Sequence, residues 1–462
     1  MALTDEQVAD LTAQRFDRTR ISRGFGERVP ASALPPGLRW PTFAQSVGLL
    51  RFRHQFVPWM HRRFGDVFTV RLLPGGQPLV LFARPEHARE IFAGDPEVFH
   101  AGKGNAILGP IMGEHSLLLQ DGAEHKRARR LLMPAFNGAA LAGYESLVTE
   151  VAKAEVAAWQ PGTEFRALDR MNALTLEVIL RVVFGVTDEK RLAELRPRVR
   201  RTVDISPAVL LLAFGSPWLK RIGPWKAAIE NAAELDKLIY AEITERREAP
   251  DLAARTDVLS RLILTDDGGD ALTDPELRDQ LVTLLLAGHE TTASALSWTL
   301  WELGRDGAQL ARARDAARSG DLTWLEAVLK ESMRLHPVIP MVVRTLLQPA
   351  TIGGVDLPAG VTIGPSILLA HSRPENHPEP QEFRPERFLE QHGNRVGPPP
   401  NTWIPFGGGV RRCIGAGFSL MEGVAVLREV LTSYDVTAVG EDEPRVRNIT
   451  SVPRRGARIV VS

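Results

Sequence analysis

The spacing of apolar and polar residues divides the chain into a short β region, a long helical region and a mixed region towards the C-terminus. Two runs rich in β-branched and aromatic residues lie within residues 67–82 and flank a Pro-Gly-Gly turn, which predicts a hairpin. From about residue 85 to residue 334, apolar residues recur mainly with the helical period. Short β-like runs and turns follow, before a last helix predicted at about 417–434. The pattern predicts a mainly α protein with a smaller β region.

One long helix is predicted from about Thr273 to Asp306. Thr273 and Glu276 have the spacing of a capping box, with a proline between them in the first turn. The apolar middle of this helix runs into Ala287-Gly-His-Glu-Thr-Thr292, which places a carboxylate and two hydroxyls on it. Burying such groups is costly unless they serve a function, and here they would suit proton delivery. A helix with a polar, exposed side is the alternative.

Composition and charge narrow the class of protein. Lys plus Arg and Asp plus Glu both total 56, so nothing in the net charge points to a nucleic-acid partner. A single cysteine fits a reducing compartment, and no apolar run is long enough to span a bilayer, so we expect a cytoplasmic protein with no membrane span. With no repeat or linker, residues 1–34 are interpreted as an N-terminal extension and residues 35–462 as a single domain.

The lone thiol lies in the loop Phe406-Gly-Gly-Gly-Val-Arg-Arg-Cys-Ile-Gly415, just before the last helix. Backbone amides and the helix dipole there stabilise a thiolate, which is a soft anionic metal ligand. The glycines allow a flat partner to approach the backbone, and Arg411 can neutralise its anionic groups. A buried structural cysteine and a catalytic nucleophile are the alternatives, although no histidine near in sequence could act as its base.

This loop matches every fixed position of the haem-binding signature of the cytochrome P450 family, namely Phe406, Gly409, Arg411, Cys413 and Gly415. The resemblance covers roughly residues 35–462 and is to soluble bacterial-type members. It implies heme b (iron protoporphyrin IX), buried between a long central helix and the cysteine loop and its helix. It also implies that Cys413 is the axial iron ligand, a role for which this family is itself the standard example. Phe406 would pack beside the sulfur and tune it.

The segment 287–292 resembles the oxygen-binding helix motif of the same family. The resemblance puts Glu290 at the acid position, as a proton relay, and Thr291 at the alcohol position, where oxygen is held. His289 falls at a variable position and is interpreted as an ordinary polar residue. Ala287 and Ile339 would be the substrate contacts nearest the iron.

A pair of charged residues three apart on a predicted helix, Glu331 and Arg334, can meet on one face and hold a third charged group. It resembles the family's Glu-x-x-Arg motif, whose distant arginine partner is here Arg387. The resemblance implies a structural role for these three residues.

His125 and Arg129 are one helical turn apart and therefore share a face. By resemblance they bind the haem propionates together with Arg344 and Arg411, although a solvated basic helix face is the alternative for His125. Lys126, Arg127 and Arg130 point elsewhere. Together with Arg412 they form either a basic patch for an acidic electron donor or ordinary surface charge.

The resemblance implies a monooxygenase that inserts one atom of O2 into a hydrophobic small molecule, such as a terpenoid, steroid or fatty acid. Electrons would come from NAD(P)H through a separate ferredoxin or flavodoxin and its reductase, and we expect a monomer. Substrate contacts are expected in four mostly uncharged segments, at about 100–112, 209–218, 338–343 and 449–453.

Two other functions remain open at the sequence level. A haem-thiolate isomerase or peroxygenase would share the fold and Cys413 but commonly lacks the acid-alcohol pair, so Glu290 and Thr291 favour oxygen activation. A haem-based gas sensor would need no proton relay and normally carries a signalling domain.

Overall fold

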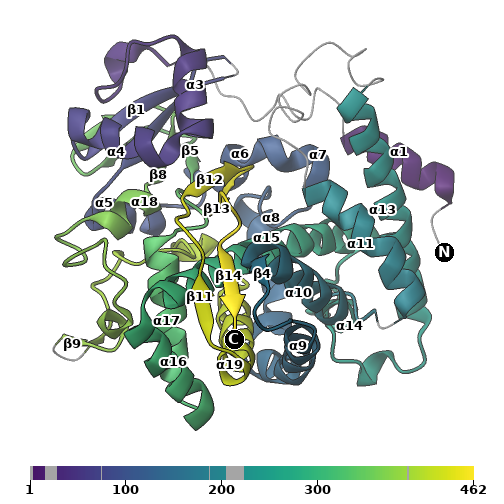
Figure 1. Cartoon of the computed structure of the whole chain (residues 1–462). Coiled ribbons are helices and arrows are strands. Elements are labelled where there is room, and N and C mark those ends of the chain that lie inside the picture. Colours follow the sequence, from purple (N-terminus) through teal and green to yellow (C-terminus); the bar gives the residue numbers. More distant parts are fainter. Residues whose placement is uncertain (1–3, 16–28, 74, 187, 204–222, 393–394) are drawn as a thin grey trace. The chain divides into compact units, whose positions relative to one another are not determined.

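The structure is a computed structural model that describes residues 4–15, 29–73, 75–186, 188–203, 223–392 and 395–462 (Figure 1). Helices predominate over strands, as the sequence pattern predicts. The chain forms two compact units, each built from several segments: the first comprises residues 1–25, 100–147 and 175–290, and the second comprises residues 26–99, 148–174 and 291–462. The single-domain interpretation of residues 35–462 stays a prediction.

The first unit is built almost entirely of helices. Arg278, one of its buried arginines, contacts Asp236 at 2.6 Å and Asp279 at 2.8 Å, so its charge is paired inside the unit. Three of its helices, α9, α10 and α15, continue into the second unit. The helices with residues in this unit are α1 (Asp5–Arg15), α6 (Ala101–Gly104), α7 (Gly109–Met112), α8 (Gly122–Leu132), α9 (Gly138–Ala157), α10 (Ala167–Val182), α11 (Glu189–Val203), α13 (Gly223–Glu248), α14 (Val258–Leu264) and α15 (Asp274–Arg305).

The second unit contains the sheets. The largest has the order β1-β2-β8-β5-β3, with β1 and β2 antiparallel and β2 and β8 parallel. A three-stranded sheet has the order β11-β14-β4, and three hairpins join β6 to β7, β9 to β10 and β12 to β13. The strands are β1 (Val67–Leu72), β2 (Gln77–Phe82), β3 (Phe99–His100), β4 (Glu164–Arg166), β5 (Arg344–Leu346), β6 (Ala350–Ile352), β7 (Val355–Leu357), β8 (Thr362–Pro365), β9 (Gln391–His392), β10 (Arg395–Val396), β11 (Val436–Ala438), β12 (Pro444–Arg447), β13 (Thr450–Pro453) and β14 (Arg458–Val461).

Some helices of the second unit pack against the largest sheet, others pack on one another, and the cysteine loop leads into the last of them. They are α3 (Thr42–Arg51), α4 (Arg53–Phe64), α5 (Pro85–Ala93), α16 (Gly307–Ser319), α17 (Leu322–Leu335), α18 (Ile367–Ser372) and α19 (Ala416–Ser433), together with the 3-10 helices η6 (Pro385–Phe388) and η7 (Gly409–Arg411). None of the helices in the described part of the chain is both long enough and apolar enough to cross a bilayer.

Several sequence predictions are confirmed at the level of single elements. The predicted hairpin is the β1–β2 pair, with Val67 opposite Phe82 and Leu72 opposite Gln77. The long helix α15 begins one residue after Thr273, where the Thr273 amide donates to Glu276 Oε2 at 2.8 Å, as a capping box requires. The last predicted helix is α19.

A buried ion cluster fixes the second unit around helix α17. Arg334 donates to both carboxylate oxygens of Glu331, at 2.8 and 2.9 Å, and Arg387 of η6 donates to Glu331 Oε1 at 2.8 Å. The exposed fractions of these three side chains are 1%, 0% and 5%. Arg334 also donates to the carbonyl oxygens of His371 and Pro380, at 3.0 and 2.8 Å. The predicted meeting of Glu331, Arg334 and Arg387 is therefore present in the structure.

Replacing Glu331 by Gln should destabilise the protein strongly, because it leaves two buried guanidinium groups with too little negative charge. We expect the free energy of unfolding to fall by about 3–5 kcal/mol, measured by urea titration followed by far-UV circular dichroism. Glu230→Gln is the control, since the Lys226–Glu230 pair is exposed and should contribute less than about 1 kcal/mol. Equal losses in the two variants would contradict a structural role for the cluster.

Candidate active site

The loop that carries Cys413 is folded by its own backbone hydrogen bonds. The Gly407 amide donates to Ile404 O at 3.0 Å, and the Cys413 amide donates to Phe406 O at 2.9 Å. Gly407 and Gly409 have φ values of 65° and 64°, a left-handed conformation that other residues adopt only with strain. Cys413 is exposed and lies three residues before the first residue of α19. The loop therefore presents the thiol at a helix N-terminus.

The glycines of this loop differ in what surrounds them. A Cβ atom at Gly408 would lie 2.4 Å from the Phe92 ring, and one at Gly409 would lie 2.0 Å from Phe92 O, so these two glycines let the loop pack against α5. At Gly415 an added Cβ would meet no atom within 4 Å. The expectation that all four glycines serve a flat bound partner is therefore too broad, because Phe92 accounts for two of them and Gly415 is the one beside open space.

Polar and aromatic contacts connect the ion cluster to the cysteine loop. Burial holds the pKa of His371 well below its usual range, so the imidazole is neutral and Nε2 accepts a hydrogen bond from the Ile404 amide at 2.9 Å. The Trp403 ring lies 5.4 Å from the Phe388 ring and 5.9 Å from the Phe406 ring, edge-on in both cases. Since Arg334 holds the His371 carbonyl, the cluster positions the segment that leads into Phe406.

Helix α15 carries the predicted acid and alcohol on a continuous helix. Glu290 is buried, with 5% of its surface exposed, whereas Ala287 is exposed and Thr291, one turn later, is half-buried. Ala287 and Thr291 therefore share the open face of the helix. Gly288 faces the other way, where a Cβ would lie 2.7 Å from Ile179 of α10. His289 is buried and its Nδ1 lies 2.9 Å from Thr175 Oγ1, as suits a residue with a packing role.

A second buried carboxyl follows the cysteine loop, and sequence reasoning missed it. Glu422 of α19 is fully buried, and neither carboxyl oxygen makes a hydrogen bond of ordinary geometry to a described residue. Burial raises the pKa of Glu422 to about 8, and the neighbouring Thr292 hydroxyl opposes this shift only partly. Thr292 Oγ1 in turn lies 3.2 Å from Ser419 Oγ. An acid flanked on both sides by apolar residues, from Leu420 to Leu427, was the sequence signal for this residue.

Helix α8 separates its basic residues as the sequence predicts. His125 is buried and Arg129 half-buried on one face, while Lys126 and Arg130 are exposed. The predicted basic patch is not free, however. Arg127 donates to Asp270 and Glu276, at 2.8 and 2.5 Å.

Arg130 is also engaged, because it contacts Asp267 and Asp270 at 2.6 and 2.9 Å. These two arginines hold the segment before α15 and have little unpaired charge to offer an acidic protein.

Two of the predicted substrate segments lie together in the second unit. The Ser451 amide donates to Val338 O at 2.8 Å, which joins the 449–453 segment to the 338–343 segment. Ile339 is partly exposed and packs on the cluster that includes Phe92 and Ile404. Of the other two segments, 100–112 forms helices of the first unit and 209–218 lies outside the described residues.

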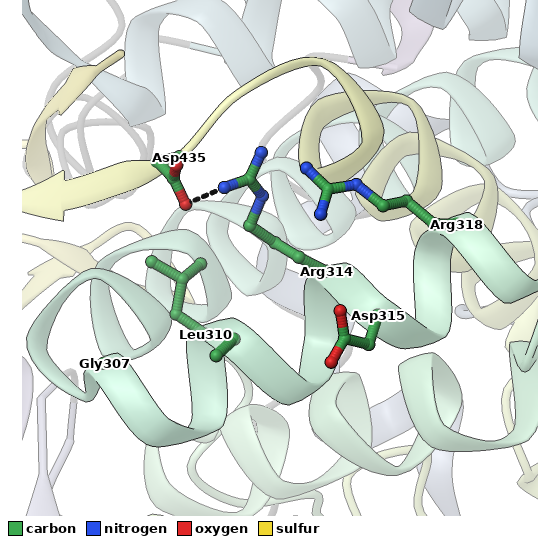
Figure 2. A pocket seen from close by; sticks show the side chains of 7 residues that line it. Gly307, Leu310, Arg314, Asp315, Arg318 and Asp435 are labelled. Carbon is green, nitrogen blue, oxygen red and sulfur yellow. Dashed lines mark ion pairs between the residues drawn. The ribbon is translucent and has the colours of Figure 1, made fainter.

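A surface pocket beside α16 is unrelated to these residues (Figure 2). Figure 2 shows Arg314 turned towards Asp435, with which it forms an ion pair. Arg314 also donates to Leu431 O at 3.2 Å, at the end of α19. The pocket therefore surrounds a structural contact between α16 and the end of α19.

Comparison with known proteins decides the family. A family model described as Cytochrome P450 matches residues 34–459. Cytochrome P450 135A1 of Mycobacterium tuberculosis is 54% identical over 432 residues, covering 93% of this chain and 95% of that protein. The chain belongs to the cytochrome P450 family. Another relative, cytochrome P450 135B1 of Mycobacterium bovis, is 41% identical, covering 93% of this chain and 91% of that protein.

Solved cytochrome P450 structures have the same fold. The retinoic acid-bound cyanobacterial CYP120A1 is 25% identical, with a TM-score of 0.81 over 93% of this chain and 99% of that one. The cytochrome P450DA heme domain, 24% identical over 93% of this chain and 98% of that one, has a TM-score of 0.79 and shows the fold alone. This cytochrome P450 is a monooxygenase and uses haem b as its cofactor.

The residues of the cysteine loop fit haem b. Cys413 is the only soft anionic donor of the chain, it is exposed, and open space lies beside Gly415 two residues later. Phe406 is fixed by Trp403, and Arg411 supplies a positive charge at the end of η7. An arrangement of one thiolate with open space and a nearby cation suits a metal whose other ligands belong to an anionic macrocycle.

The structure brings together only part of the predicted site. In the second unit, Cys413, Phe406, Arg411 and Gly415 belong to one loop, and the hydrophobic cluster on which Ile339 packs includes Ile404, two residues before that loop. Arg344 is buried on β5, where it donates to Val343 O at 2.8 Å. His125, Arg129, Ala287 and Glu290 belong to the first unit, and Thr291 begins the last segment of the second.

The pKa of Glu422 predicts a specific pH dependence of stability. Its folded-state pKa of about 8 lies above the ordinary value of 4.5, so the protonated carboxyl favours folding. This contribution is complete below the unfolded-state pKa and is lost as the pH rises through the folded-state pKa. Between about pH 5 and pH 8 the free energy of unfolding should fall by a few kcal/mol relative to that of Glu422→Gln. Urea titrations across this range measure the difference.

Glu429→Gln provides a matched control on the same helix, because Glu429 lies against Arg428 near the surface. That variant should keep the wild-type slope. If wild type and Glu422→Gln lost stability in parallel as the pH rose, Glu422 would not be held protonated.

Proposed function

We propose that this cytochrome P450 inserts one atom of O2 into a hydrophobic small molecule, with Cys413 as the axial ligand of haem b. The observation that carries the proposal is the exposed thiol of Cys413 in a loop fixed from several sides and followed by a helix. Haem b ligated by a thiolate supplies the activation of molecular oxygen. The protein supplies binding, orientation and protons.

Four basic side chains are proposed to bind the haem propionates. Arg344 and Arg411 would contribute from the second unit, and His125 and Arg129 from α8. The chemistry of Arg344 supports this role, since a guanidinium can donate two parallel N–H groups to one carboxylate. Phe406 would pack beside the sulfur, and Gly415 would allow the macrocycle close to the backbone.

Proton delivery is assigned to two adjacent residues of α15. Thr291 lies on the open face of the helix, where its hydroxyl can hold an oxygen molecule and pass on a proton. Glu290 is buried on the neighbouring face, where a carboxyl that changes side-chain conformation can bring protons from outside. An acid and an alcohol at these positions favour oxygen activation over a peroxygenase, an isomerase or a gas sensor.

The substrate is proposed to be a terpenoid, a steroid or a fatty acid. Ala287 and Ile339 offer apolar surfaces, and the 338–343 segment, which contains Ile339, carries no acidic residue. A relative in fold is bound to retinoic acid, an isoprenoid carboxylic acid, which supports an apolar ligand of this size.

Electrons are proposed to come from NAD(P)H through a separate ferredoxin or flavodoxin and its reductase. The enzyme would act as a monomer in the cytoplasm. Arg127 and Arg130 are poor candidates for docking the electron donor because acidic side chains already pair with them. Lys126 and Arg412 are exposed and form no ion pair with a described residue, so they are better candidates.

Replacing Thr291 by Ala should uncouple electron consumption from product formation. Haem and substrate should still bind, while the yield of product per NAD(P)H falls and hydrogen peroxide rises, because the proton is no longer delivered in time. Glu290→Gln should slow turnover by about 10²-fold or more with little change in substrate binding. Product, NAD(P)H and peroxide are measured together with surrogate redox partners.

Thr299→Ala is the control for both variants. Thr299 lies two turns further along α15, where its hydroxyl donates to Ala295 O at 2.7 Å, so its loss should leave the coupling unchanged. An unchanged product yield in both Thr291→Ala and Glu290→Gln would remove these residues from proton delivery. Product formation driven only by peroxide would favour a peroxygenase.

A further inference from the structure

Helix α3 buries polar side chains and exposes apolar ones, which is the reverse of an ordinary surface helix. Its buried positions are Gln45, Ser46 and Leu49, two of them polar. Gln45 accepts from the Arg71 amide at 2.9 Å and donates to Trp40 O at 2.8 Å, and Ser46 accepts from the Leu73 amide at 2.9 Å. The polar face of α3 is therefore used to dock the helix on β1, which Figure 1 shows beside it.

The opposite face of α3 is apolar and faces away from the unit. Phe43, Val47 and Leu50 are spaced at i, i+4 and i+7, so they line one side of the helix. Their exposed fractions are 68%, 36% and 40%. Trp40 and Phe52, just before and after the helix, are exposed by 51% and 50%. Surface helices normally show the reverse pattern.

Neighbouring turns extend this apolar surface. Leu73 in the β1–β2 turn is held beside α3 by the bond from its amide to Ser46. Ile449 in the β12–β13 turn accepts from Arg53, two residues after α3, through its carbonyl at 3.2 Å. Together these residues make up what is here named the α3 face: Trp40, Phe43, Val47, Leu50, Phe52, Leu73 and Ile449. Seven of the thirteen large exposed apolar side chains of the described residues thus gather at one place, which marks a binding surface.

The stretch of chain that contains α3 and α4 carries formal charge of one sign. No acidic residue occurs from Val29 to Gly65, whereas Arg39, Arg51, Arg62 and Arg63 are all exposed there. None of these four arginines forms an ion pair with a described residue. An apolar helix face that carries aromatic side chains and is bordered by unpaired arginines is the composition of helices that lie in a membrane interface.

We propose that the α3 face binds the surface of an anionic lipid bilayer, with α3 lying in the plane of the headgroups. Phe43, Val47 and Leu50 would enter the boundary between headgroups and acyl chains. Trp40 would lie at the headgroup level, where its ring is amphipathic. The arginines would contact lipid phosphates, which is why a bilayer fits this face better than a second copy of the chain with the same positive charge.

Vesicle flotation tests the proposal with the haem-loaded full chain. Vesicles of phosphatidylglycerol and phosphatidylcholine should carry the protein upwards, and vesicles of phosphatidylcholine alone should carry much less. The variant Phe43→Glu/Leu50→Glu should reduce the partition coefficient at least about tenfold. Leu264→Glu/Leu322→Glu is the matched control, because those two leucines are exposed by 48% and 39% outside the α3 face. It should bind like the wild type.

Two further experiments separately test the contribution of the arginine charges and the depth to which Trp40 enters the bilayer. Arg39→Gln/Arg51→Gln should lower the partition coefficient by about fivefold for each arginine at low salt, and the difference should shrink at high salt. Brominated lipids should quench tryptophan fluorescence of the wild type, and Trp40→Phe should remove most of that quenching. Trp40 is the one tryptophan of the described residues with more than a third of its surface exposed.

Two results would overturn the proposal. One is a wild-type protein that does not float with anionic vesicles, or that floats equally well after Phe43→Glu/Leu50→Glu. The other is a wild-type dimer in light scattering that this variant converts to a monomer without any vesicle binding, because the α3 face would then be an interface between two copies of the chain.

Discussion

The Glu331 carboxylate is the interaction on which the rest of the second unit depends. It is completely buried and accepts hydrogen bonds from the side chains of Arg334 and Arg387 and from the Arg384 amide. A carboxylate in such a place is stable only while all of its acceptors are used, and the two guanidinium groups are stable only beside it. This mutual requirement joins α17 to the 3-10 helix η6, although the two are more than 50 residues apart in sequence.

A series of hydrogen bonds connects this cluster to the cysteine loop. Arg334 holds the His371 carbonyl, the neutral His371 ring holds the Ile404 amide, and Ile404 O accepts from Gly407. On the other side, Phe388 of η6 packs edge-on against Trp403, which packs against Phe406. The proposed thiolate ligand must be held at a fixed place, and this network of hydrogen bonds and aromatic contacts fixes the backbone that leads into its loop.

The parts of the fold that could be predicted from the sequence are those specified by local pattern. The β1–β2 hairpin, the start of α15 at its capping box and the helix α19 follow from spacing and turn residues alone. The meeting of Glu331 with Arg387 was predicted only through resemblance to a family. Its components lie too far apart for periodicity to reveal.

The parts that sequence reasoning missed depend on partners distant along the chain. Arg127 was interpreted as free surface charge because Asp270, which neutralises it, is 143 residues away. Gly409 was assigned to a ligand because its contact with Phe92 cannot be seen in the loop itself. The periodicity of α3 did not indicate that its polar side faces inwards, because the groups that pair with Gln45 and Ser46 are backbone amides in and after β1.

The most direct test of the account is the spectrum of the reduced protein with carbon monoxide. Cys413, the only cysteine of the chain, is the proposed axial ligand of the haem iron. The wild type should give the red-shifted Soret band for which the family is named, and Cys413→Ser should lose it while the far-UV circular dichroism is retained. A Cys413→Ser protein that kept this band would contradict the assignment of the thiolate and, with it, the proposed active site.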